Sequence, residues 1–173
     1  MKTYLIGYAA IAATVSVACS ASPPPAAKAA QTEQRQCVPG QTAQQEDELV
    51  RSTRVLAVQP IYSHVRTSNN DAEERVNGAK LLVRPPPGMT IETMTRLLQC
   101  HSARILLGQT SADAVTSDPY WLPDTWVAID VKAEDGNFAV TLTTDTVRDN
   151  LRVYGRANRY ADEHTLANGS GLP

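Results

Sequence analysis

The stretch PPPGMTIETMTRLLQCHSARILL, residues 85–107, decides the fold, because it ends one element and begins the next. Three prolines and Gly88 terminate a preceding strand, and Thr90 is a residue type that caps helices. At about 100° per residue, apolar side chains recur on one face of a helix from about Ile91 to Leu107. This expected core face consists of Ile91, Met94, Leu97, Leu98, His101 and Ile105, with Glu92, Arg96, Gln99 and Ala103 opposite.

Two strands are expected before this helix. The segment from Arg54 to Val65 has strand character, and Pro60 within it favours an edge position or a break. The polar run 68–71 is typical of a loop, Asn77-Gly78 indicates a turn, and residues 80–84 form the second strand. Residues 43–52 contain good helix formers and predict a short helix ahead of the strands.

A hairpin and a second long helix are expected after residue 124. The strands of the hairpin alternate apolar and polar residues, and Glu134-Asp135-Gly136-Asn137 supplies the turn. Thr144 or Asp145 can cap a final helix that runs through about Tyr160. The apolar residues of these elements are Val127, Ile129 and Val131, then Phe138, Val140 and Leu142, and finally Val147, Leu151, Tyr154 and Ala161.

The order strand-strand-helix-hairpin-helix predicts an α+β domain, with a mostly antiparallel four-stranded sheet and two helices packed on one face. We expect a signal peptide at 1–18, a flexible linker at 19–45, the single domain at 46–165 and a flexible tail at 166–173. The sequence leaves the strand order open.

The chain of 173 residues carries 16 basic and 18 acidic residues, which gives no electrostatic bias toward nucleic acid. We expect no nucleic-acid partner. A glycine-rich phosphate loop and the serine motif of hydrolases are both missing from the sequence, and the acidic pairs lie in expected helices or turns. The sequence therefore predicts neither a cofactor nor an enzyme.

The N-terminus begins Met1-Lys2 and is apolar from Tyr4 through Ala18, which is typical of a secretory signal. The motif Ser16-Val17-Ala18-Cys19 resembles the lipobox of bacterial lipoprotein precursors. This resemblance covers the leader and implies an acylated Cys19 as the first residue of the mature chain. The family usually has a branched apolar residue where this chain has Ser16, and ordinary signal peptidase is the alternative. An exported protein held to the outer membrane by its lipid, facing the periplasm, is the expectation.

If Cys19 carries lipid, Cys37 and Cys100 remain as an even pair. Exported chains meet oxidising conditions, so we expect a disulfide between them. It would close a loop of roughly 60 residues and stabilise the fold by about 2–4 kcal/mol. Two free thiols are the alternative.

Two features could carry chemistry near the middle of the chain. His101 and Met94 share a helix face beside Cys100, which suggests a weak soft-metal site. A buried histidine bonded to a backbone carbonyl is the simpler interpretation. In the loop 108–124, Tyr120 and Trp121, with Trp126 just beyond, suggest an aromatic platform for a partner or a sugar. The alternative is that Trp121 and Leu122 plug one end of the domain.

A stripe of arginines follows the final helix: Arg148, Arg152, Arg156 and Arg159 lie within about 80° of one another. Such a face suits anionic headgroups or an acidic envelope surface, although many charge runs are simply solvated. Gly155 within this helix costs about 1 kcal/mol relative to alanine, and close packing is one reason for it. The sequence thus predicts a protein-binding or scaffolding module whose partner is an unknown envelope protein, with a periplasmic carrier of a small ligand or soft metal as the alternative.

Overall fold

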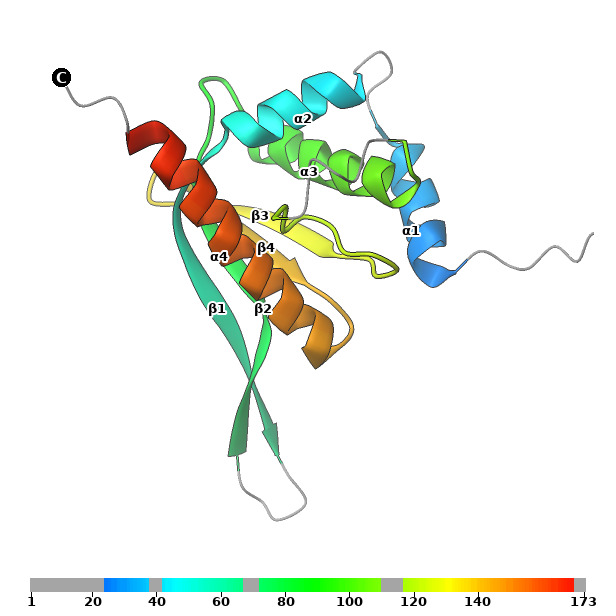
Figure 1. The fold of residues 1–173 in the computed structure, drawn as a ribbon, viewed down its shortest axis with the longest axis vertical. Helices are drawn as coiled ribbons and strands as arrows, with labels where there is room; N and C mark the ends of the chain where they lie inside the picture. The colour runs from blue at the N-terminus through cyan, green and yellow to red at the C-terminus, as the bar shows by residue number, and fades with distance from the viewer. Residues whose placement is uncertain (1–23, 38–41, 67–71, 110–116, 170–173) are drawn as a thin grey trace, which may run out of the picture.

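The computed structural model describes residues 24–37, 42–66, 72–109 and 117–169. In chain order its elements are α1 (Pro25–Gln34), α2 (Ala43–Ser52), β1 (Arg54–Arg66), β2 (Ala72–Arg84), α3 (Ile91–Leu106), β3 (Ala128–Glu134), β4 (Asn137–Thr143) and α4 (Val147–Gly169) (Figure 1). The fold class is α+β, and the predicted order strand-strand-helix-hairpin-helix is confirmed from β1 onward.

The four strands form one sheet in the order β1-β2-β4-β3, and each neighbouring pair is antiparallel. Leu81 on β2 pairs with Val140 on β4, which pairs with Val131 on β3, so the three side chains share one face. All three are buried in a single core cluster with side chains from both α3 and α4. Helix α4 packs on β1 and β2, and α3 packs on β3. The two long helices therefore cover the same face, as predicted.

The edges and the turn of the sheet follow local sequence rules. Pro60 lies in β1 at the edge of the sheet, where a residue without an N–H is tolerated. The β3–β4 hairpin turns through Asp135 and Gly136, with φ angles of 49° and 75°. Positive φ at both central residues is what a twisted two-residue hairpin requires, so the turn prediction is confirmed.

Gly78 is not part of a turn, because β2 begins at Ala72 and passes straight through it. The pairing of β1 with β2 shifts between Ile61 and Tyr62, which places a bulge beside this glycine. Its φ is +146°, and a Cβ there would lie 2.2 Å from the carbonyl oxygen of Leu142. A close approach of β4 to β2, rather than a reversal of the chain, explains the glycine.

Helix α3 begins as predicted. The Thr90 hydroxyl accepts a hydrogen bond from the backbone N–H of Thr93 at 3.2 Å. Burial extends around more of the helix than its apolar stripe indicates, because Cys100, Ser102 and Ala103 are buried as well. Helices α1 and α2 both pack on α3, which accounts for this second covered side.

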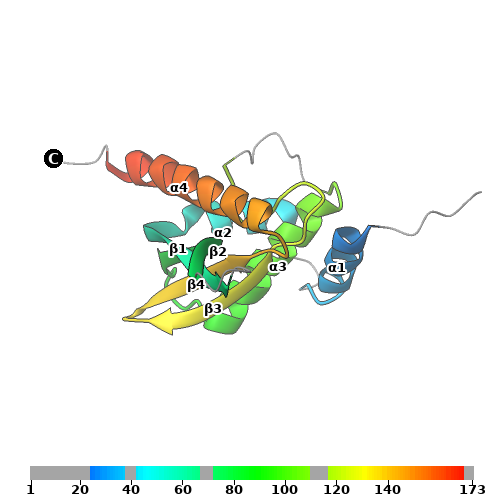
Figure 2. The same cartoon turned by 90° about the horizontal axis from the view of Figure 1, so that it is seen from below.

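The linker prediction is wrong for Pro25–Gln34, which form α1. This helix buries Ala26 and Ala30 as it packs on α3. A disulfide between Cys37 and Cys100 ties the end of the segment to α3, with a Cα–Cα distance of 5.7 Å, so the predicted pairing is confirmed. In both views α1 lies at the end of the molecule opposite the C-terminal end of α4 (Figures 1 and 2).

Helix α4 is longer than predicted, and its buried face is not the predicted one. It continues to Gly169, so residues 166–169 are helical rather than a tail, and residues 170–173 lie outside the described residues. Val153, Ala157 and Tyr160 form its buried face. Leu151, assigned to the core by the sequence, is 51% exposed, and Val147 is exposed too, because Leu151 lies about 200° around the helix from Val153.

Replacing Gly155 by alanine should stabilise the protein. A Cβ at this position meets only Arg159 Nη1, at 3.9 Å, so the close packing considered from the sequence is not the reason for this glycine. Alanine in a helix interior is favoured over glycine by about 1 kcal/mol. Urea unfolding of the G155A variant should give a higher midpoint at an unchanged slope. A lower midpoint would mean that the backbone here needs the freedom of glycine.

Candidate functional site

A buried histidine, His101 on α3, is 3% exposed and has acidic side chains on both sides of its ring. Its Nε2 lies 2.5 Å from Oδ2 of Asp118, which precedes β3 and is also buried. Its Nδ1 lies 3.7 Å from Oδ1 of Asp47 on α2. Both ring nitrogens therefore face carboxylates that come from different parts of the chain.

The surroundings of His101 favour its charged form. Burial opposes protonation, but the hydrogen bond to Asp118 and the negative charges of Asp118, Asp47 and Glu46 together raise the pKa of His101. The other oxygen of Asp118 accepts the backbone N–H of Tyr120 at 2.8 Å, which fixes the carboxylate. An imidazolium held in this way joins α2, α3 and the segment before β3.

A pocket of about 140 Å³ opens beside this pair, between α2, α3, the segment at residues 117–118 and α4. Ser117 donates a hydrogen bond of 2.5 Å to Glu163 at its rim, and the ring of His164 stacks on Tyr160 with centroids 3.8 Å apart. Titratable groups from separate segments thus converge here. Both ring nitrogens of His101 face carboxylates, so the geometry favours a structural ion pair over a general base with a free ring nitrogen.

The soft-metal hypothesis finds no support in this geometry. Met94 is buried in the core, and the sulfur of Cys100 belongs to the disulfide. Within the described ranges, no group of three His, Cys, Asp or Glu side chains could hold a metal ion. The prediction that His101 bonds a backbone carbonyl is wrong, because its partner is the Asp118 carboxylate.

Tyr120 and Trp121 are both buried, which contradicts an exposed aromatic platform at these residues. Leu122 is buried as well, which agrees with the plug interpretation of Trp121 and Leu122. Trp121 packs with Ile105 in a small cluster of its own. The guanidinium of Arg156 lies 4.9 Å from the centre of the Trp121 ring, at cation–π distance. Burial raises the pKa of Tyr120.

The four arginines of the stripe differ in their contacts. Arg156 donates hydrogen bonds to the carbonyls of Asp118 and Trp121, at 3.2 and 2.8 Å, and so braces the segment before β3. Arg152 pairs with Asp149 at 2.9 Å. Arg148 and Arg159 are exposed. Two of the four arginines therefore have structural contacts, while Arg152, Arg156 and Arg159 together line a shallow hollow on α4.

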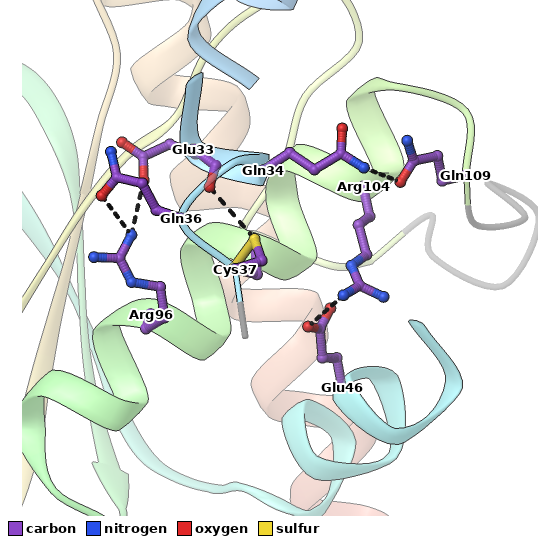
Figure 3. The surroundings of a disulfide bond; sticks show 9 residues. Glu33, Gln34, Gln36, Cys37, Glu46, Arg96, Arg104 and Gln109 are labelled. Carbon is purple, nitrogen blue, oxygen red and sulfur yellow. Dashed lines mark hydrogen bonds and ion pairs between the residues drawn. A yellow bond between two sulfur atoms is a disulfide. The ribbon is translucent and has the colours of Figure 1, made fainter. Parts of the chain in front are cut away.

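The surroundings of the disulfide hold a group that the sequence analysis missed (Figure 3). Glu46 on α2 is 1% exposed, and its Oε1 lies 3.1 Å from Nη2 of Arg104 on α3. Arg96 on α3 contacts Glu33 and Gln36 at 3.3 and 3.0 Å. The sequence predicts a short surface helix around Glu46. No local sequence pattern indicates that this helix, α2, packs on α3.

No protein-family model matches the chain, and neither a curated protein nor a solved structure shows significant similarity to it. Among the helices of the described ranges, none is long and apolar enough to cross a membrane. The candidate lipidation residue Cys19 and the expected signal peptide at 1–18 lie outside the described residues.

Proposed function

We propose that the chain is an exported protein, anchored by lipid at Cys19 to the outer membrane, whose α+β domain docks another envelope protein. The cysteines support export. The bond between Cys37 and Cys100 uses two of the three cysteines, and the third, Cys19, follows the lipobox-like motif. A disulfide is typical of proteins from oxidising compartments.

The proposal that the domain docks a partner rests on a two-stranded arm formed by β1 and β2. Strand β2 pairs with β4 over Ala79–Val83, whereas its pairing with β1 continues to Ala72. Asn77 still contacts Asn150 on α4, and Gly78 lies against β4, but the paired segments 62–66 and 72–76 extend past the N-terminal end of α4 and leave the body of the domain (Figure 1). Projecting strands and sheet edges offer backbone groups and side chains to a partner.

The side chains of the arm resemble the centre and rim of a protein interface. Only 5% of the residues of the chain are aromatic, and one of them, Tyr62, is 55% exposed on the arm. Around it lie charged or titratable side chains: His64 lies 3.8 Å from Glu74, and Arg75 pairs with Glu73 at 2.7 Å. Interfaces commonly have an exposed aromatic anchor within a polar rim.

The anchor is tested by the intact mass of the protein extracted from bacterial membranes, with thiols alkylated before any reduction. We expect a chain that starts at Cys19, carries acyl groups and shows no alkylation. A soluble chain with alkylated cysteines would contradict both the anchor and the oxidising compartment.

The arm is tested by a photoreactive phenylalanine analogue placed at Tyr62 and crosslinked in cells. Lys132 on β3 is the matched control, because its side chain is 78% exposed at the other edge of the sheet. We expect one discrete protein adduct from position 62 and none of that mass from position 132. Identical adducts from both positions, or none from position 62, would rule out the arm as the docking element.

A further inference from the structure

A second pocket, of about 250 Å³, lies between α2 and α3 next to the disulfide. Leu49 on α2 and Leu97 and Cys100 on α3 form its apolar wall, and Thr93 also lines it. Leu97 and Cys100 are buried, whereas Thr93 is exposed, so the pocket has an apolar interior and an open mouth. This shape suits a small apolar body that enters from solvent.

Glu46 lines the same pocket and has an incomplete set of hydrogen bonds. Its Oε1 contacts Arg104, but its Oε2 is buried and has no hydrogen-bond partner within the described ranges. A buried carboxylate oxygen without a donor lowers the stability of the folded state. A ligand that donates a hydrogen bond to this oxygen would remove that cost.

The charges around the pocket favour a cation over an anion. Glu46 and Glu92 both line it, together with Arg96. The guanidinium of Arg96 is already engaged by Glu33 on α1 and by Gln36 just after this helix, as Figure 3 shows. An added carboxylate would therefore meet two acidic groups, whereas an ammonium would meet complementary charge.

We propose that this pocket binds a small amphiphilic amine, with the apolar body against Leu49 and Leu97 and the ammonium paired with Glu46. The terminal torsion of a glutamate side chain is soft, so Oε2 can turn toward the ligand while Oε1 stays near Arg104. Burial raises the pKa of Glu46 although Arg104 and His101 oppose the shift, which agrees with a carboxylate that lacks one partner.

The test is an amide NMR titration of the purified chain with hexylamine, hexanol and hexanoate at neutral pH. Hexylamine should shift the amides of Leu97 and Cys100 saturably. Hexanol should bind about tenfold more weakly, because it lacks the charge that strengthens the bond to Glu46, and hexanoate should not bind. Equal effects of hexylamine and hexanoate, or no saturable shift at these amides, would overturn the proposal.

Three variants locate the site. In Glu46→Gln the preference for hexylamine over hexanol should disappear. Thr93→Trp fills the mouth of the pocket without changing Glu46 or Arg104, and it should abolish the binding of both ligands. Gln99→Trp, on α3 outside the pocket lining, is the matched control and should bind hexylamine like the unmodified chain. Unchanged hexylamine binding in Thr93→Trp would contradict this site even if Glu46→Gln fails to fold.

Discussion

Replacing Asp118 by alanine should lower the free energy of unfolding by about 3–5 kcal/mol, the usual cost of removing one partner from a buried ion pair. The change takes away the hydrogen bond to His101 and the acceptor for the backbone N–H of Tyr120. Urea unfolding at pH 6, followed by circular dichroism, measures the loss. Because both side chains are buried, the variant leaves His101 poorly solvated and without this partner.

Asp118→Asn is the matched control, because it keeps the shape of the side chain and an acceptor for Tyr120 while it removes the charge. We expect it to lose less stability than the alanine variant. A loss below about 1 kcal/mol in the alanine variant, typical of an exposed pair, would contradict a structural role for the buried pair.

The same pair predicts a pH dependence. The pKa of His101 is raised above its ordinary value of 6.5, so the protonated ring stabilises the folded state fully below that pH. Stability should then fall as pH rises through the raised pKa of the folded protein. In Asp118→Asn this slope should be much smaller. An equal slope in both proteins would show that another group titrates.

Removing the disulfide should have the second largest effect. The Cys37→Ala/Cys100→Ala double variant should be less stable by about 2–4 kcal/mol, because the bond closes a long loop in the unfolded chain. The two cysteines are 63 positions apart. Chemical denaturation of the variant and of the reduced wild type should give similar midpoints. Because the reduced wild type lacks the bond but keeps the Cys100 side chain, this comparison separates loss of the bond from a packing defect at Cys100.

Hydrogen exchange should show where the disulfide acts. Helix α1 buries Ala26 and Ala30, and its polar contacts to α3 through Arg96 are half-exposed. Its amides should therefore exchange faster after reduction, by more than the amides of the sheet. If α1 keeps its protection in the reduced protein, its packing on α3 is sufficient without the covalent bond.

The elements that could be predicted from the sequence are those whose turns or caps require particular residue types. The Asp135-Gly136 turn and the Thr90 cap each require particular residue types, so the β3–β4 hairpin and the start of α3 could be located. Helix α1 could not, because its buried residues are two alanines and its stability depends on α3 and the disulfide. The face of α4 was misassigned because Leu151 is apolar but exposed.

The sites were harder to predict than the fold. Sequence analysis singled out His101 but not its partner, because Asp118 is 17 residues away in a segment without periodicity. Glu46 looked like an ordinary helix residue, since its burial results from the packing of α2 on α3. Tyr120 and Trp121 were correctly noted as unusual, but their burial follows from tertiary packing that the loop sequence does not encode locally.

The position of Cys37 in the chain sets the order in which the native thiols become available. Synthesis proceeds from the N-terminus, so Cys19 and Cys37 emerge well before Cys100. During that interval Cys19 is the nearest thiol with which Cys37 could form a wrong bond. Attachment of lipid to the Cys19 sulfur would remove this competitor. In this protein the proposed anchor would therefore also act as a protecting group that directs Cys37 to its native partner.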